Sequence, residues 1–176
     1  MNINELFGVS GKVAIVTGGS RGIGEMITSG FLANGVKVYI TARKEGPLIE
    51  KAEELSKKYN GDCIPIACDL SSTVGTNYFV EKILKNEEGI DFLINNAGAA
   101  WGEPYKSFSE SGWDKVMDLN VKSLFFLTQK LTDLLKANAS REDPSRVINI
   151  GSIDGLNVPA FETYSYSTSK AAVHHL

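Results

Sequence analysis

The sequence has few of the residues that bind metals or form disulfides. Its 176 residues contain two cysteines and two histidines. Cys63 and Cys68 fall in one apparent strand, and their odd spacing directs their side chains to opposite faces of a sheet. We therefore expect two small, buried thiols in a reducing compartment rather than a disulfide, a redox pair or a metal site. His174 and His175 are interpreted as surface residues of a helix.

Long apolar runs and a strong charge of either sign are also missing. The apolar runs are too short to span a bilayer, and MNINELFGVSGK lacks the basic start and apolar core of a signal peptide. A net charge of −3 gives no reason to expect nucleic acid or an anionic membrane as a partner. No repeat, linker or low-complexity segment divides the chain. The sequence therefore favours one soluble, cytoplasmic domain over residues 1–176.

Strand-like and helix-like patterns alternate along the chain. Five apolar runs have the continuous hydrophobicity of strands buried on both faces, namely KVAIVTGG, VKVYITAR, DCIPIACDL, IDFLINNAG and SRVINIGS. The segments between them have helical spacing. This alternation predicts right-handed β-α-β units, and hence a Rossmann-like doubly wound parallel sheet with helices on both faces.

The helical segments have their own start and stop signals. The first ends at Gly35, and its apolar residues at helical spacing are Ile23, Met26, Ile27, Phe31 and Leu32. The second, PLIEKAEELSKKYNG, begins with proline and ends with glycine. The fourth, SGWDKVMDLNVKSLFFLTQKLTDLLKANA, is predicted to be one long helix, and a further helix begins near Tyr164.

The stretch TGGSRGIG joins the first strand to the first helix. A glycine pattern alone is a weak signal, but here a strand precedes it and a helix follows, as in a dinucleotide-binding turn. Gly18 lets the chain turn sharply, whereas Gly22 and Gly24 remove side chains where a pyrophosphate and the packed strand come close. The helix then offers N–H groups and positive charge to phosphates. The alternative is a tight turn without a ligand.

With these glycines and the motifs that follow, the sequence resembles the short-chain dehydrogenase/reductase family. The motifs occur in the family's order: T-G-x-x-x-G-x-G, Asp69 closing the third strand, NNAG at 95–98, Asn120, Ser152, and the Y-x-x-x-K pair Tyr166 and Lys170. The resemblance covers essentially the whole chain. It implies that the following residues bind the cofactor: Gly18, Ser20, Arg21, Gly22, Ile23, Gly24, Arg43, Asp69, Leu70, Asn96, Ala97, Gly98, Tyr166 and Lys170. In the family, the Asp binds the adenine amino group and the NNAG stretch lies along the cofactor.

The charge at the end of the second strand indicates which nicotinamide cofactor is bound. An NAD-binding protein places a carboxylate there for the ribose 2′-OH. This sequence has Thr41 and Ala42 at that point, followed by Arg43, and Arg21 lies inside the glycine turn. Because arginine binds phosphate with a planar fork of donors, we predict NADP(H). The alternative for Arg43 is a solvated charge at a strand end.

The stretch YSYSTSK contains the candidate general acid. A tyrosine hydroxyl has a pKa of about 10, and a nearby ammonium lowers it. Lys170 lies one helical turn after Tyr166, whereas Tyr164 has the uncharged Thr168 at the same offset. Tyr166 is therefore predicted to give a proton to the substrate oxygen, and Tyr164 to be a packing or substrate-edge residue.

The resemblance implies catalytic roles for the other residues of the group Asn120, Ser152, Tyr166 and Lys170. Ser152 would hydrogen-bond the substrate oxygen, and Lys170 would also bind the nicotinamide ribose. Asn120 would disturb the long helix and hold a water that links Lys170 to solvent. The spacing from Ser152 to Tyr166 is one residue longer than is usual in the family. The extra residue falls in the loop IDGLNVPAFETYS, where an apolar lining is expected from Leu156, Val158 and Phe161.

Three stretches, GAAWGEPYKSF, SGWDKVMDLNV and RVINIGSIDG, are similar to the NADPH-dependent 3-oxoacyl reductases, such as those of rhamnolipid synthesis. This implies a 3-oxoacyl thioester substrate, with acyl carrier protein or CoA as the carrier, and a role in fatty acid metabolism. A polyol, sugar or small-ketone reductase and a non-catalytic NADP-binding fragment are the alternatives. The family normally continues well beyond the position of Leu176. The resemblance therefore also implies a missing carboxyl-terminal part, and a homo-oligomer, dimer or tetramer, for the full-length chain.

Overall fold

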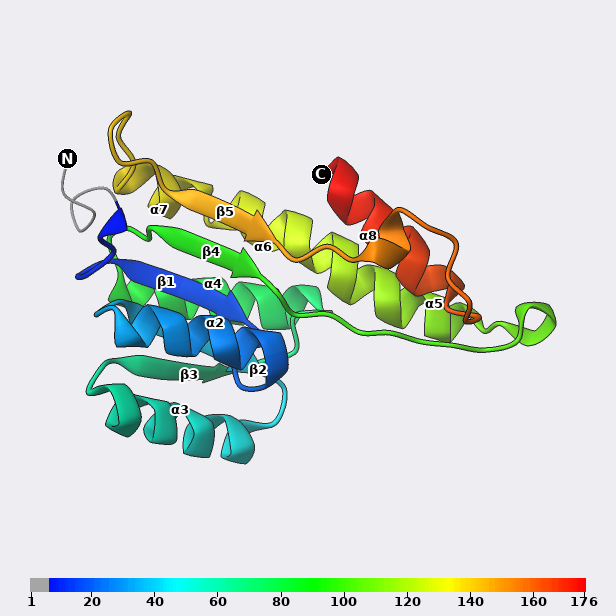
Figure 1. Cartoon of the computed structure of the whole chain (residues 1–176), viewed down its shortest axis with the longest axis horizontal. Coiled ribbons are helices and arrows are strands. Elements are labelled where there is room, and N and C mark those ends of the chain that lie inside the picture. Colours follow the sequence, from blue (N-terminus) through cyan, green and yellow to red (C-terminus); the bar gives the residue numbers. More distant parts are fainter. Residues whose placement is uncertain (1–6) are drawn as a thin grey trace.

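The computed structural model describes residues 7–176 and contains a five-stranded parallel sheet (Figure 1). The strands are β1 (Val13–Thr17), β2 (Lys37–Ala42), β3 (Cys63–Ala67), β4 (Phe92–Asn95) and β5 (Arg146–Asn149), in the spatial order β3-β2-β1-β4-β5. The order reverses between β1 and β4, so right-handed crossovers place helices on both faces. The predicted doubly wound α/β fold and its five strands are confirmed.

A hydrophobic core covers each face of the sheet. On one face, α2 (Gly22–Ala33) and α3 (Glu45–Tyr59) contribute leucines that pack on Ala14 and Val16 of β1. On the other face, the side chain of Ile15 meets α4 (Thr73–Asn86), α6 (Leu124–Lys130) and α7 (Thr132–Ala137). Successive residues of a strand point to opposite faces, so β1 serves both cores. This explains why the strands read as unbroken apolar runs.

The first two helices differ in detail from the sequence prediction. Leu32 of α2 is buried, but Ile23 and Met26 are 60% and 74% exposed, so the apolar set does not form one buried face. Small residues, among them Gly24 and Thr28, make up the rest of the buried stripe, because α2 lies close to the sheet. In α3, the left-handed residue that ends the helix is Asn60, with φ of +49°, rather than the predicted glycine.

The prediction of one long, continuous helix is wrong. The segment consists of α5 (Glu110–Met117), the π-helical segment η2 (Asp118–Ser123), α6 and α7, and the backbone of Leu131 leaves the helical region between the last two. Apolar periodicity does not reveal a π-helical turn, which often marks a functional site. Asn120 lies in the middle of η2. None of the helices formed by residues 7–176 is long and apolar enough to cross a membrane.

Part of the chain projects beyond the carboxyl ends of β4 and β5 (Figure 1). Helix α8 (Tyr164–His175) packs there against α5 and η2. Two connections flank it. We call residues 99–109 the arm, which contains η1 (Tyr105–Ser107), and residues 150–163 the β5–α8 loop, which contains η3 (Ile153–Gly155). The functional side chains are expected where this projection meets the sheet.

Cys63 and Cys68 face opposite sides of the sheet, as their spacing predicted, and both thiols are free. Burial raises the pKa of Cys63 to about 12 and also raises the pKa of Cys68.

Because the thiolate is the reactive form, iodoacetamide should label the native protein at pH 8 at least about tenfold more slowly than the urea-unfolded chain. The unfolded thiol ionises near its ordinary pKa of 9.0 and the folded Cys63 thiol near 12, so this residue makes the free energy of unfolding fall as pH rises through that interval. Equal labelling rates in the two states would contradict this burial.

Candidate functional site

A cavity of about 780 Å³ opens at the carboxyl ends of the strands. Open parallel sheets bind ligands at this edge, where the strand order reverses, and the volume is typical of cofactor sites. Eleven of the predicted cofactor residues line it, namely Gly18, Ser20, Arg21, Ile23, Gly24, Arg43, Asp69, Leu70, Asn96, Ala97 and Gly98. Gly22, Tyr166 and Lys170 do not belong to the lining. Sequence reasoning did not assign Lys44, Pro47, Leu48, Cys68 and Leu119 to the site, and these residues line the cavity as well.

Close backbone contacts shape the glycine turn. Gly18 has φ of +65°, which allows the sharp turn out of β1. A Cβ on Gly24 would lie 2.2 Å from the carbonyl oxygen of Gly18, so no larger residue fits there. A Cβ on Gly19 would lie 2.5 Å from Ile40 Cγ2, so a side chain does not fit here either, although the motif assigned no role to Gly19. A Cβ on Gly22 would meet no described atom within 4 Å, so the turn leaves open space at this point.

Thr17 and Asn96 fix the glycine turn to the end of β4. Thr17 Oγ1 accepts hydrogen bonds from the backbone N–H groups of Asn96 and Ala97, both at 2.9 Å. Asn96 Nδ2 donates to the carbonyl oxygens of Thr17 at 2.9 Å and Gly18 at 3.2 Å. The Asn96 side chain is therefore engaged within the protein, and its function is to hold the cavity wall. Thr17 was missed because the motif indicates its position but not these bonds.

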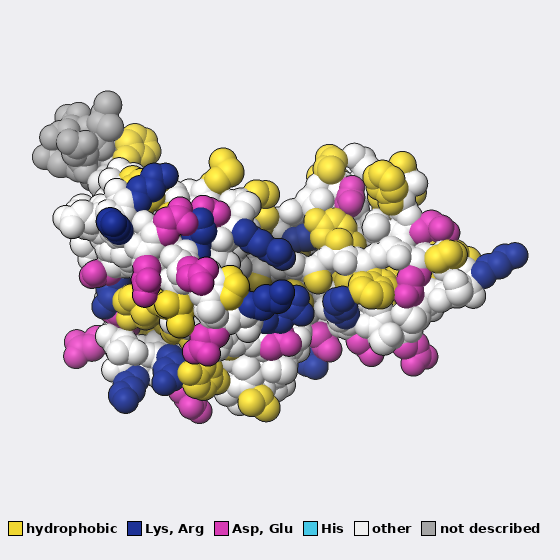
Figure 2. Space-filling view, turned by 90° about the horizontal axis from the view of Figure 1, so that it is seen from below, with side chains coloured by type: hydrophobic (Ala, Val, Ile, Leu, Met, Phe, Trp, Pro, Cys, Tyr) yellow, Lys and Arg dark blue, Asp and Glu magenta, His cyan; other side chains and the backbone are white. Residues whose placement is uncertain are grey.

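Three basic residues surround the cavity near the end of β2. Arg21 precedes α2, and Arg43 and Lys44 follow β2. Helix α2 has no side-chain cap, so its first N–H groups and its partial positive charge add to the basic side chains. Figure 2 shows Lys and Arg side chains gathered near the middle of this face of the molecule. Positive charge thus dominates this part of the cavity, and Lys44 strengthens the signal that the sequence drew from the two arginines.

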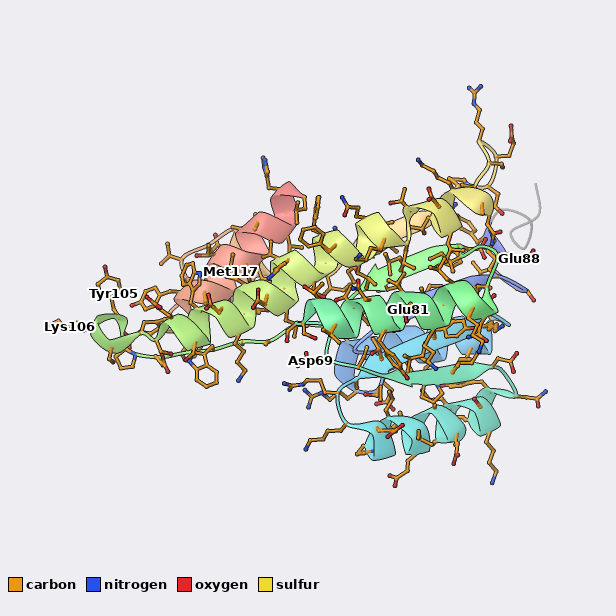
Figure 3. The ribbon with its side chains drawn as sticks, turned by 180° about the vertical axis from the view of Figure 1, so that it is seen from behind. Asp69, Glu81, Glu88, Tyr105, Lys106 and Met117 are labelled. Atoms are coloured by element: carbon orange, nitrogen blue, oxygen red, sulfur yellow. The ribbon has the colours of Figure 1, made fainter. Side chains whose placement is uncertain are left out.

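Asp69 follows β3 at the same edge of the sheet (Figure 3). Its Oδ1 accepts hydrogen bonds from the Ser71 backbone N–H at 3.1 Å and from Ser71 Oγ at 2.8 Å. These bonds fix the carboxylate on the cavity wall. Its other oxygen, Oδ2, accepts no hydrogen bond from residues 7–176 and is available to a ligand's donor.

Tyr166 and Lys170 lie one turn apart on α8, and Lys170 Nζ is 5.7 Å from the centroid of the Tyr166 ring. Lys170 is only 6% exposed, and its Nζ donates a hydrogen bond of 2.6 Å to the carbonyl oxygen of Ile150, just after β5. Burial lowers the pKa of this ammonium. The structure therefore places a buried cation beside the tyrosine that the sequence singled out.

Ser152 directly precedes η3, which packs on α8. Its Oγ accepts a hydrogen bond of 3.2 Å from the Asp154 backbone N–H, and its own N–H donates to His174 Nε2 at 3.4 Å. A Cβ on Gly155 would lie 2.6 Å from the Lys170 carbonyl carbon, so η3 packs directly on α8. The exposed His174 is thus a surface residue, as predicted, and also a partner of the Ser152 backbone.

Asn120 links the chain after β4 to α8. The residue is 2% exposed, and its Nδ2 donates to the Ala99 carbonyl oxygen and to Ser169 Oγ, both at 2.9 Å. Its Oδ1 accepts from the Ala99 N–H at 2.8 Å, and Ser169 Oγ donates to the Tyr166 carbonyl oxygen at 2.7 Å. Because the whole side chain is used in these bonds, a water held by Asn120 would contact its backbone rather than its amide. The side chain itself acts as a clamp.

Replacing Asn120 with leucine is expected to lower the free energy of unfolding by about 2–4 kcal/mol, because buried groups of Ala99 and Ser169 lose their partner. Urea denaturation measures this. The control is Asn86→Leu, whose exposed amide donates only to Lys82 within α4 and should change stability by less than about 0.5 kcal/mol. Equal effects of the two substitutions would contradict the clamp.

A parallel sheet whose strand order reverses, with a glycine-lined cavity at the carboxyl ends of its strands, defines a Rossmann-like α/β protein. Within that class, the sequence pattern of the short chain dehydrogenase family matches residues 12–176, and the chain belongs to this family. The resemblance inferred from the motifs is thereby confirmed.

Two curated relatives show how far the similarity extends. The rhamnolipids biosynthesis 3-oxoacyl-[acyl-carrier-protein] reductase of Pseudomonas aeruginosa is 45% identical over 170 residues, which cover 97% of this chain and 66% of that protein. Dehydrogenase/reductase SDR family member 11 of Bos taurus is 35% identical over 164 residues, which cover 92% of this chain and 64% of that protein. The chain therefore spans somewhat less than two thirds of the length of these relatives.

Solved structures of other proteins show the same similarity. The complex of RhlG from Pseudomonas aeruginosa with NADP superimposes with a TM-score of 0.91 at 46% identity, over 96% of this chain and 65% of that one. The L-sorbose reductase of Gluconobacter frateurii, complexed with NADPH and L-sorbose, gives a TM-score of 0.89 at 30% identity, over 96% of this chain and 62% of that one. Both proteins were thus solved with an NADP-type cofactor.

Proposed function

We propose that this chain belongs to an oxidoreductase that binds NADP(H) and reduces a carbonyl group to a secondary alcohol. One observation carries the proposal: the buried ammonium of Lys170 lies beside Tyr166, where α8 meets the carboxyl end of β5. A buried cation next to a hydroxyl is an arrangement that tunes a proton donor. The other groups of the site fit the same reaction.

The cavity suits a dinucleotide with an additional phosphate. The space at Gly22 and the uncapped start of α2 suit the pyrophosphate. Arg21, Arg43 and Lys44 suit a 2′-phosphate, and the last residue of β2, Ala42, supplies no carboxylate to repel it. Asp69 Oδ2 can accept a bond from the adenine amino group. The two similar structures solved with NADP and NADPH support this assignment.

The chemistry supplied by bound NADPH is transfer of a hydride to the carbonyl carbon. The protein's part begins with Ser152, whose hydroxyl donates to the carbonyl oxygen and holds it beside Tyr166. As negative charge develops on that oxygen, the Tyr166 hydroxyl gives it a proton, so the new C–H and O–H bonds complete the alcohol. The positive charge of Lys170 stabilises the tyrosine oxygen that has lost its proton. Asn120 keeps α8 in register with the cavity wall through Ser169 and Ala99.

The leading substrate class is a 3-oxoacyl thioester carried by acyl carrier protein or CoA. Its support is the 45% identity to a protein named as a 3-oxoacyl-[acyl-carrier-protein] reductase. The second candidate is a sugar or polyol ketone, which the similarity to an L-sorbose reductase favours. Association with an acyl carrier protein, homo-oligomer formation by the full-length chain and a cytoplasmic location stay predictions of the sequence.

Steady-state NADPH oxidation with acetoacetyl-CoA, L-sorbose and a panel of small ketones tests the proposal. We expect the highest kcat/KM with the thioester. Turnover of sugars but of no thioester would move the assignment to the second candidate. NADPH binding without turnover of any carbonyl compound would favour a non-catalytic NADP-binding fragment.

A further inference from the structure

The imidazole of His174 lies directly on the backbone that carries Ser152. The N–H of Ser152 donates a hydrogen bond of 3.4 Å to His174 Nε2. A Cβ built on Gly151 would lie 2.3 Å from the same nitrogen and 2.7 Å from His174 Cδ2, and its third nearest atom, at 3.6 Å, is His174 Cε1. The imidazole thus occupies the space that a side chain at position 151 would fill.

This contact comes from the side of α8 that carries the candidate catalytic pair. Tyr166, Lys170 and His174 follow one another at intervals of four residues, so they share one side of the helix. Lys170 Nζ donates to the carbonyl oxygen of Ile150, and His174 Nε2 accepts from the N–H of Ser152. Two successive turns of α8 therefore hold the chain immediately after β5 (Figure 1).

Ser152 is bonded through its backbone and its side chain to different partners. Its N–H donates to His174, and its Oγ accepts from the N–H of Asp154 in η3 at 3.2 Å. The bond to Oγ uses a lone pair, so the hydroxyl proton remains to be donated to a ligand. The β5–α8 loop contributes these bonds rather than the apolar lining that the sequence predicted, because its apolar side chains are between 71% and 96% exposed, namely Leu156, Val158 and Phe161.

We propose that His174 is a positioning residue for Ser152. Its neutral imidazole holds the Ser152 backbone in the orientation that aims the hydroxyl at the substrate's carbonyl oxygen. This inference rests on the proposed function, in which Ser152 donates to that oxygen. A protonated imidazole has no acceptor nitrogen, so the bond to the Ser152 N–H is lost in acid. Since histidine side chains change charge between about pH 5 and pH 8, kcat is expected to fall as the pH is lowered through that interval.

The other titratable residues around the imidazole predict a different pH dependence. On α8, Tyr166 must keep its proton to donate it and Lys170 must keep its charge, so both limit the rate at high pH rather than at low pH. In η3, Asp154 contributes its backbone N–H, which does not titrate. The η2 segment packs on another side of α8, through Asn120 and Ser169. A fall in kcat in acid therefore reports on the histidine.

The kinetic test uses three replacements of His174, measured as kcat at saturating NADPH with the carbonyl compound that is reduced fastest. Glutamine carries its amide where Nε2 of histidine lies, whereas asparagine carries it at the level of Nδ1 and does not reach the Ser152 N–H. His174→Ala and His174→Asn should each lower kcat about three- to tenfold at neutral pH, as expected for one hydrogen bond, with an unchanged Kd for NADPH. His174→Gln should keep kcat within about twofold of the native value.

The pH profile separates positioning from a general loss of stability. The native kcat should fall about three- to tenfold from about pH 7.5 to about pH 5.5, whereas that of His174→Gln should fall by less than about twofold, because an amide does not titrate there. His175→Gln removes the adjacent, exposed histidine and is the matched control, which should keep the native profile.

Gly151→Ala tests the same contact from the opposite side. The new Cβ would displace the exposed imidazole, so this variant should lose as much kcat as His174→Ala. When His174 is already alanine, the space is vacant, and Gly151→Ala should lower kcat no further. Additive losses in the double variant would overturn the proposal, because the glycine would then act independently of the imidazole.

Hydrogen exchange of the Ser152 amide, followed by NMR, requires no turnover. After correction for the intrinsic exchange rate, exchange should be at least about threefold faster in His174→Ala than in the native protein or in His174→Gln. If the native protein reduces no carbonyl compound but exchange responds in this way, the proposed function fails and the positioning role fails with it, while the contact stands. If an active His174→Ala enzyme keeps its kcat, or His174→Gln keeps the fall in acid, the positioning role is overturned and the proposed function is unaffected.

Discussion

Replacing Tyr166 with phenylalanine is expected to lower kcat for carbonyl reduction by about 10²–10⁴ while leaving NADPH binding nearly unchanged. The substitution removes the proposed proton donor but keeps the ring, whose centroid lies 5.7 Å from Lys170 Nζ. Packing of α8 on the sheet should therefore survive. Steady-state kinetics gives kcat, and the quenching or enhancement of cofactor fluorescence on titration gives the Kd for NADPH.

The control for this substitution is Tyr78→Phe. Tyr78 is 44% exposed on α4 and lies far along the chain from every residue assigned to the reaction, so kcat should stay within about twofold. A Tyr166→Phe variant with more than about a tenth of the native kcat would show that another group supplies the proton. The same result with intact NADPH binding would leave the cofactor assignment untouched.

Replacing Arg43 with aspartate is expected to lower the preference for NADPH over NADH by roughly 10²–10³. A hydrogen bond to a charged group contributes about 1.5–3 kcal/mol, and the new carboxylate also repels the 2′-phosphate. A carboxylate at this position can in addition accept a bond from the ribose 2′-OH of NADH. Titration with the two cofactors at the same salt concentration measures the Kd for NADH divided by the Kd for NADPH. In the native protein this ratio should fall as salt is added, because salt screens the basic residues Arg21, Arg43 and Lys44 from the 2′-phosphate.

Arg141→Asp makes the same charge change in the exposed α7–β5 connection and should leave the cofactor preference unaltered. If both variants lower NADPH affinity equally, the preference comes from the net charge of the molecule rather than from a phosphate site. If neither does, Arg43 is a solvated charge and Arg21 and Lys44 hold the phosphate without it.

Local patterns sufficed to predict the sheet and the approximate positions of its strands. The apolar runs were recognisable because β1, β2 and β4 are covered on both faces, and the glycine turn because Gly18 and Gly24 meet in space only six residues apart in sequence. The offset from Tyr166 to Lys170 fixes a common helical face without any knowledge of the rest of the fold. Residue spacing along one element therefore predicted reliably which residues of that element share a face or a turn.

Features that depend on contacts between distant segments were not predictable. Ile40 of β2 leaves no space for a side chain at position 19, and the Thr17 hydroxyl accepts a hydrogen bond from the backbone of Asn96 after β4. Neither role is visible in the motif itself. The break at η2 was missed because a π-helical turn leaves the apolar pattern of the helix almost intact.

The clamp formed by Asn120 has a consequence for the order in which ligands bind. Ala99 continues the cavity wall formed by Ala97 and Gly98, and Ser169 belongs to the helix of Tyr166, so a single amide joins these two segments. A dinucleotide that immobilises the wall is therefore expected also to narrow the motion of the helix that carries Tyr166. The second ligand would then meet a site whose conformational entropy is already reduced, and we expect positive cooperativity without a change of shape. Ordered kinetics, with the nucleotide first, is the behaviour that this one side chain favours.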